Sequence, residues 1–129
     1  MKKFNLFSAL VIVVTTIYSF AYSKALNDPQ FKWPLLSHDF GKIKNGKPVT
    51  FTFNFTNVGK APLIVSAAKA GCECTTAKYI NGPIAPGKAG HIEVTYNAAA
   101  TGKFSKTISV SSNATEIPEE LTITGEVVD

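Results

Sequence analysis

Arginine is absent from the sequence, and its absence limits the partners that the protein can bind. All 13 basic residues are lysines, set against 9 aspartates and glutamates, which gives the whole chain a net charge of +4. Arginine supplies the planar, two-pronged donor that recognises phosphates and base edges, whereas the lysine ammonium is a single point of charge. Cleavage after Ala25, argued below, would remove Lys2, Lys3 and Lys24 and lower the net charge to +1. We therefore predict no nucleic-acid partner.

Cysteine is nearly absent as well: Cys72 and Cys74, in the stretch "AGCECTTAKY", are the only two. Two are too few for a disulfide scaffold. In an extended segment their Cα atoms would lie about 6.5–6.8 Å apart, at the upper edge of disulfide geometry, so a bridge requires a bend. A local disulfide is favoured in an oxidising compartment. Two packed thiols, a soft-metal ligand pair and a redox catalyst remain open alternatives.

Motifs of catalysis and of metal binding are missing too. The sequence has no Gly-x-Ser-x-Gly, no phosphate-cradling loop and no His-Glu-x-x-His. His38 and Asp39 are adjacent in an expected strand, so they face opposite ways and cannot act on one proton. His91 is the other histidine; Cys72, Cys74 and His91 form only a minor alternative site for a soft ion such as Cu(I). We predict no enzymatic activity and no cofactor.

The first 25 residues have the organisation of a secretory signal peptide. Lys2 and Lys3 precede a mostly apolar run over residues 4–17, which is shorter than the roughly 20 residues that span a membrane. Small residues then offer cleavage after Ala21 or Ala25. We expect residues 1–25 to be removed on export to the periplasm or the extracellular side of the envelope. The mature chain would have no membrane span.

The rest of the chain alternates apolar and polar residues, as half-buried β-strands do. In "KPVTFTFNFTNVG" one face carries Val49, Phe51, Phe53 and Phe55, and the other carries Thr and Asn. Six further short segments follow or precede it: "HDFGKI", "PLIVSAAKA", "TTAKYI", "GHIEVTYN", "KFSKTISVSS" and "EELTITGEVV". Seven strands in about 100 residues predict an all-β, immunoglobulin-like antiparallel β-sandwich over residues 38–129. Residues 26–37 form an extended lead-in whose Phe31 and Trp33 pack on the domain edge.

The alternation also predicts which side chains make up one core. The inward-facing set is Phe51, Phe53, Phe55, Ile92, Val94, Tyr96, Phe104, Ile108, Val110, Leu121 and Ile123.

Several motifs in fixed order resemble those of one family. They are Phe40-Gly41, Asn57-Val58-Gly59, Cys72-Glu73-Cys74-Thr75, Pro86-Gly87 and Gly102-Lys103-Phe104. Over about residues 39–127 the chain resembles domain of unknown function 1573, a family of exported bacterial domains with a Cys-Gly-Cys-Thr core. Glu73 stands where that family usually has a small residue, often glycine. The resemblance implies an immunoglobulin-like sandwich and no established activity.

These observations predict an exported, non-catalytic binding or structural module of the bacterial cell envelope. Its partner would be an envelope protein of unknown identity, bound through sheet edges or loops; a sandwich edge can bind a partner by adding a strand. The alternative is a periplasmic protein that handles thiol redox chemistry or a soft metal such as copper with Cys72 and Cys74.

Overall fold

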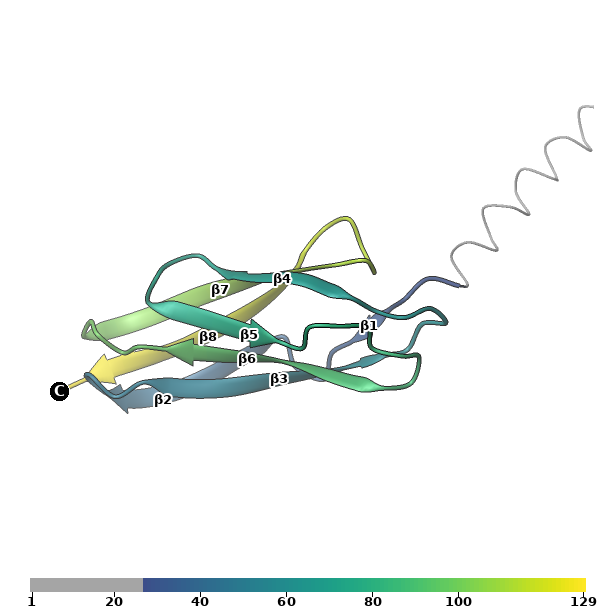
Figure 1. The fold of residues 1–129 in the computed structure, drawn as a ribbon. Helices are drawn as coiled ribbons and strands as arrows, with labels where there is room; N and C mark the ends of the chain where they lie inside the picture. The colour runs from purple at the N-terminus through teal and green to yellow at the C-terminus, as the bar shows by residue number, and fades with distance from the viewer. Residues whose placement is uncertain (1–26) are drawn as a thin grey trace, which may run out of the picture.

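The alternating segments of the sequence form eight strands in the computed structural model, which describes residues 27–129 (Figure 1). The expected signal peptide lies outside the described residues. The strands are β1 (Phe31–Lys32), β2 (Ser37–Lys44), β3 (Val49–Asn57), β4 (Val65–Ala70), β5 (Thr75–Tyr79), β6 (Ala89–Tyr96), β7 (Gly102–Ser112) and β8 (Glu119–Val128).

Two four-stranded sheets pack face to face along a common long axis (Figure 1). One has the order β1-β3-β6-β5 and the other β2-β8-β7-β4. The predicted all-β sandwich is thus confirmed, with two differences of detail. The lead-in supplies the eighth strand, β1, and β2 pairs with β8 in parallel, so the second sheet is mixed. A two-residue strand is too short to show alternation, and the alternation is the same for parallel and antiparallel pairs.

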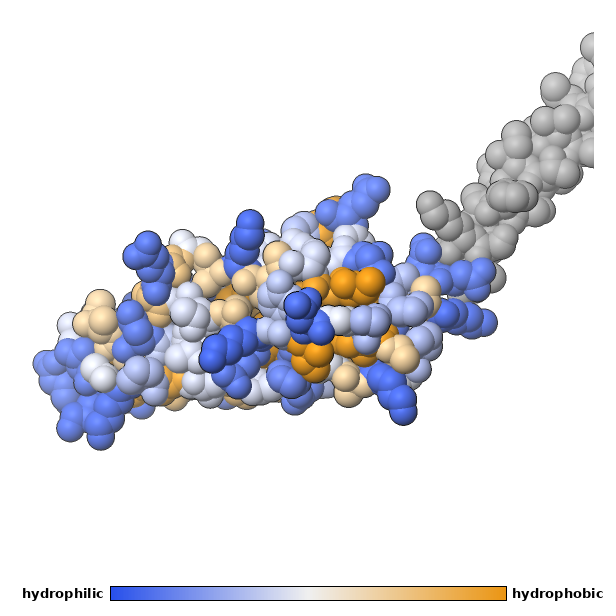
Figure 2. Space-filling model, viewed as in Figure 1, coloured by the Kyte–Doolittle hydropathy of each residue, from blue (hydrophilic) through white to orange (hydrophobic). Residues whose placement is uncertain are grey.

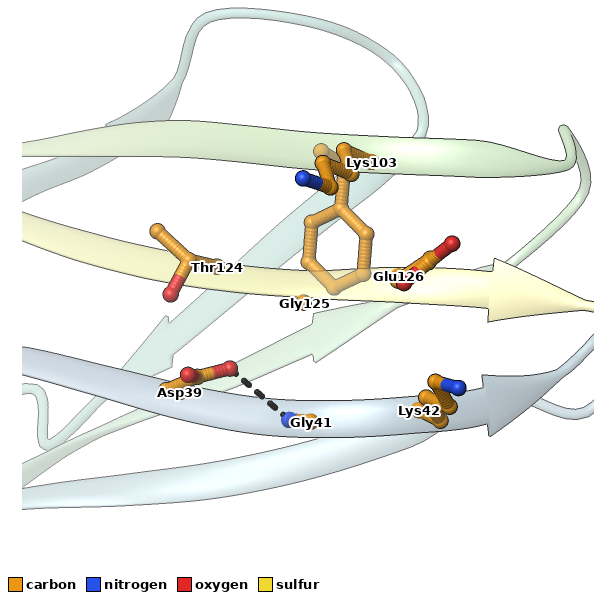
Figure 3. Close-up of a pocket in the computed structure, with 8 residues that line it drawn as sticks. Asp39, Gly41, Lys42, Lys103, Thr124, Gly125 and Glu126 are labelled. Carbon is orange, nitrogen blue, oxygen red and sulfur yellow. Dashed lines mark hydrogen bonds between the residues drawn. The ribbon is translucent and has the colours of Figure 1, made fainter.

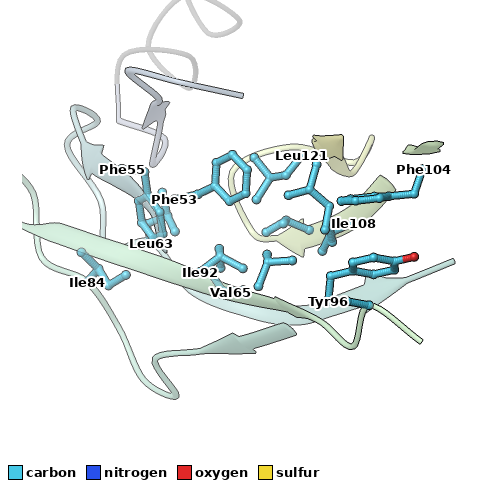
Figure 4. Close-up of a cluster of buried hydrophobic side chains, with 14 of the residues drawn as sticks. Phe53, Phe55, Leu63, Val65, Ile84, Ile92, Tyr96, Phe104, Ile108 and Leu121 are labelled. Atoms are coloured by element: carbon cyan, nitrogen blue, oxygen red, sulfur yellow. The ribbon is translucent and has the colours of Figure 1, made fainter. Parts of the chain in front are cut away.

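The core lies between the sheets and is built from the predicted inward faces (Figure 4). Phe53 and Phe55 of β3 are each 1% exposed. Every member of the predicted core is buried except Phe51, which is half-buried. Leu63, Val65, Ile84, Ala98 and Val127 complete the core.

Asn57 at the end of β3 is fully buried and joins three segments of the chain. Its side-chain oxygen accepts the N–H groups of Gln30 at 3.3 Å and Gly59 at 3.0 Å. Its amide nitrogen donates to the carbonyls of Ala61 at 2.8 Å and Ile84 at 2.9 Å. A buried amide must satisfy both its oxygen and its nitrogen, and this one does so entirely with main-chain groups.

The lead-in is held against the sandwich at the same place. A Cβ atom on Gly59 would collide with the main chain of Asp28, Pro29 and Gln30, so only glycine allows this close approach. Beyond it, the rings of Phe31 and Trp33 each lie 4.9 Å from the ring of Phe55, measured between centroids. The predicted packing of these two aromatic residues on the domain edge is therefore confirmed.

Candidate functional site

The two cysteines occupy the turn between β4 and β5, where the structure places their sulfur atoms in bonding contact. Their Cα atoms are 5.3 Å apart, well short of the spacing in an extended strand, because the chain bends through residues 71–74. Among the described residues, Ala98 is the only non-glycine residue with positive φ. Glu73 therefore adopts an ordinary backbone conformation, and the turn does not need the glycine usual in the resembling family.

Main-chain hydrogen bonds hold this turn independently of the sulfur atoms. The N–H of Gly71 donates to the carbonyl of Thr107 at 3.3 Å, and the N–H of Asn97 donates to the carbonyl of Cys74 at 2.9 Å. The buried hydroxyl of Thr75 lies 3.6 Å from Cys74 Sγ and 3.8 Å from Cys72 Sγ. The two cysteines are thus half-buried, in a turn that main-chain hydrogen bonds already connect to the rest of the domain on both sides.

Oxidation of Cys72 to Cys74 in the exported protein remains a prediction, and its effect on stability is expected to be small. A loop this short constrains the unfolded chain little, so the bridge should raise the free energy of unfolding by less than about 2 kcal/mol. Urea unfolding of the oxidised and the reduced protein measures the difference, with alkylation and intact mass fixing the redox state of each sample. The urea unfolding curve of the double variant Cys72→Ser/Cys74→Ser should be the same with and without reductant. Global unfolding of the native chain on mild reduction would contradict this expectation.

The histidines lie apart from the cysteine pair. His91 is exposed on β6, six residues before Asn97, which corresponds to about 20 Å along the strand. The structure therefore does not bring His91 to Cys72 and Cys74. Within residues 27–129, no group of three or more His, Cys, Asp or Glu residues is arranged to hold a metal ion. His38 instead stacks on the ring of Phe51, with the centroids 3.7 Å apart.

An open hollow of about 330 Å³ lies over β2, β8 and β7 (Figure 3). Gly41 and Gly125 line it without side chains, and a Cβ on Gly125 would lie within 3 Å of the Phe104 ring, so this glycine leaves room for the ring. Its rim carries both signs of charge, from Asp39 and Glu126 and from two lysines, Lys42 and Lys103. The Asp39 carboxylate accepts the N–H of Gly41 at 2.8 Å and so stabilises the positive-φ glycine where β2 bulges.

The sheet edges differ in how well they are protected against pairing with another chain. Lysines lie on three of them, namely Lys42 in β2, Lys69 in β4 and Lys78 in β5, and β2 and β4 also contain irregular register. Charge and bulges are the usual devices that blunt an edge. β3 has neither over residues 49–55, and β1 covers only its last two residues, Thr56 and Asn57.

Apolar side chains are also unevenly exposed. Figure 2 shows hydrophilic residues gathered at the end of the sandwich where the chain terminates, and hydrophobic ones toward the end nearest β1. Leu35 and Leu36, between β1 and β2, are 56% and 46% exposed. Leu35 lines a hollow together with residues 51–54 of β3, so an exposed apolar residue lies beside the least protected edge.

The two packed sheets define the chain as an all-β sandwich domain. The chain belongs to the family described as protein of unknown function DUF1573, whose model matches residues 31–127. This confirms the family indicated by the ordered motifs. A search of curated proteins finds no match.

Solved structures with a similar fold come from bacteria and from human. A protein of unknown function from Porphyromonas gingivalis W83 superposes with a TM-score of 0.68 at 18% identity, covering 79% of this chain and 48% of that one. The secreted serine protease VesC from Vibrio cholerae superposes with a TM-score of 0.57 at 16% identity, covering 85% of this chain and 25% of the protease. The ASH/PapD-like domain 7 of human CEP192 superposes with a TM-score of 0.59 at 12% identity, covering 81% of this chain and 88% of that domain. The chain thus spans about half of the first protein and a quarter of the second, and these likenesses establish the fold alone.

No helix within residues 27–129 has the length and apolar character needed to cross a bilayer.

Proposed function

We propose that the protein is an exported, non-catalytic binding or structural module of the bacterial cell envelope, which joins its partner by strand addition. The observation that carries this proposal is the edge of β3, which has no charge and no bulge and is largely uncovered. An extended segment placed there gains main-chain hydrogen bonds without any special side chain. The N-terminal segment with Lys2, Lys3 and the short apolar run supports export.

Cross-linking in the envelope of the native host tests this function. We expect a reproducible protein adduct that survives Cys72→Ser/Cys74→Ser, because the cysteine turn lies on the β4–β5 connection and not on β3. The same adduct should be lost on Thr52→Pro, which places a ring on the free edge. Recovery of the protein from the cytosol with residues 1–25 retained would refute export.

The rival function is thiol redox chemistry or soft-metal handling at Cys72 and Cys74, favoured by the contact of the two sulfurs in one half-buried turn. A metal needs thiolates, so the bridge would first have to be reduced. Metal analysis of protein purified under reducing conditions separates the two functions. Stoichiometric copper that disappears in Cys72→Ser/Cys74→Ser, together with no protein adduct, would replace the module with the metal-handling function.

A further inference from the structure

We propose that the partner at the free edge of β3 is a second copy of this chain, so that two β1-β3-β6-β5 sheets join into one. The inference rests on the proposed function, because it specifies which partner binds the edge of β3 by strand addition. Four features carry it: the direction of the main-chain groups, the proline that ends β1, the distribution of charge among the edges, and the self-complementarity of β3.

The main-chain groups of Thr50, Thr52 and Asn54 point away from the sheet. The N–H of Asn57 donates toward β6, to the carbonyl of Lys88 at 2.9 Å, whereas the N–H of the next residue, Val58, donates to Gln30 on the opposite side. Successive residues of a strand alternate in this direction, and the register of β3 with β6 is unbroken from 49 to 56. The even-numbered residues of β3 therefore direct their donors and acceptors outward.

Pro34 explains why β1 leaves this edge open. The register of β1 on β3 pairs Phe31 with Asn57 and Lys32 with Thr56, so its continuation would put Pro34 opposite Asn54. Proline has no N–H to give to the carbonyl it would face, and pairing ends there. Pro34 and Leu35 instead line a hollow of about 80 Å³ beside residues 51–54.

Charge favours a second copy at this edge over the other three. When an edge strand pairs with its own copy about a two-fold axis, a lysine close to that axis is brought near the same lysine of the other chain, and like charges placed opposite each other destabilise the pair. β2, β4 and β5 all carry lysine, whereas "VTFTFNF" at residues 49–55 carries no charge. The β3 edge can meet itself in any register without placing charged residues opposite each other.

The sequence of β3 is also self-complementary about Phe51. An antiparallel pair centred there places Thr50 opposite Thr52, which exchange main-chain hydrogen bonds in both directions, and Val49 opposite Phe53. Phe51 meets Phe51 in a non-hydrogen-bonded pair, where side chains are closest. Phe51 is the one member of the predicted core that is left half-exposed, and its own copy would cover it.

Few residues pair in this arrangement, so we expect a reversible dimer that depends on concentration rather than a permanent one. Sedimentation of the protein recovered from its native envelope measures the association. Because the edge is uncharged, the dimer should change little when the ionic strength is raised about tenfold.

Two substitutions at one position test the edge directly. Thr52→Pro removes an outward N–H that no strand of the same chain uses, and Thr52→Lys adds the charge that the other edges have. Each should raise the dimer dissociation constant at least about tenfold while thermal unfolding shows an intact fold. Thr76→Lys makes the same change on exposed β5 and should leave the dimer unaffected.

A monomer at millimolar concentration, or a dimer that persists in both Thr52 variants, would overturn the second copy as occupant. The envelope adduct separates this failure from failure of the proposed function. A monomeric protein that still cross-links to a different protein through a Thr52-dependent contact leaves the module in place and rejects only the self-pairing.

Discussion

Truncation of Phe53 to alanine is expected to lower the free energy of unfolding by about 3–5 kcal/mol, the usual cost of emptying a buried phenylalanine site. Phe53 is 1% exposed in the middle of β3, opposite Ile92 of β6. The rigid strands on both sides can collapse only partly into the vacancy, so the cavity adds to the lost burial. Urea unfolding with a fixed m-value measures the change.

Phe51→Ala is the matched control, because it removes the same ring from the same strand two residues away. Phe51 is half-buried, so less apolar surface returns to water and the loss should be clearly smaller. The measurement is made at a concentration where the protein is monomeric, so that any pairing at this edge does not contribute. A loss below about 1 kcal/mol for Phe53→Ala would show that the inward face has been assigned wrongly.

The strands that alternate over many residues are the part of the fold that the sequence predicts well. β3 and β6 each expose one apolar face to the core, and a shift of one residue would turn Phe53 and Ile92 outward. Burial therefore fixes both the identity and the register of these strands. Of the eleven core residues that the same argument predicts, ten are buried in the structure.

Features that depend on distant pairing were not predictable from the same pattern. The parallel ladder joins Ser37–Lys44 to Glu119–Val128, which are about 80 residues apart in the sequence, and alternation does not reveal strand direction. The length of β1 depends on Pro34 meeting Asn54, which becomes visible only when the register is known. The uncovered edge of β3 follows from both, so sequence could suggest strand addition but not which edge it would use.

The bend at the cysteines was expected only as a condition of bridging. The sequence shows two sulfurs two residues apart, but the contact of Gly71 with Thr107 and of Asn97 with Cys74 positions the turn. Both partners come from later strands and loops. The chemistry of the pair was therefore visible in the sequence, whereas the main-chain contacts that hold the turn were not.

Asn57 was the largest omission, because the Asn-Val-Gly motif looks like ordinary turn chemistry. Its amide in fact connects Gln30 of the lead-in, Gly59 and Ala61 of the following loop, and Ile84. Two of these four partners, Gln30 and Ile84, each lie 27 residues from Asn57 in the sequence. A polar residue at the end of an apolar strand gives no indication of such a network until the segments are assembled.

Replacement of Asn57 by alanine is expected to lower the free energy of unfolding by about 2–4 kcal/mol, because the partly buried N–H groups of Gln30 and Gly59 and the partly buried carbonyl of Ala61 lose this partner. The loss should be accompanied by faster amide exchange in β1, since the Gln30 contact ties the lead-in to the end of β3. Asn113→Ala is a matched control. The Asn113 side chain also forms hydrogen bonds with main-chain groups, at Ile64 and Pro62, but it is exposed. Because water can replace these hydrogen bonds, Asn113→Ala should lower the free energy of unfolding by no more than about 1 kcal/mol.

Asn57→Asp isolates the donor half of the network and adds a dependence on pH. The carboxylate can accept from Gln30 and Gly59, but once ionised it cannot donate to Ala61 or Ile84. Burial then raises the folded-state pKa of the introduced carboxyl above its unfolded value of about 3.9. Since the folded state holds the proton more tightly, the stability of the variant relative to the native chain should fall as the pH rises above about 4. Unfolding curves of both proteins between pH 4 and pH 8 measure this difference, and a constant difference across that range would mean that Asn57 does not donate to buried carbonyls.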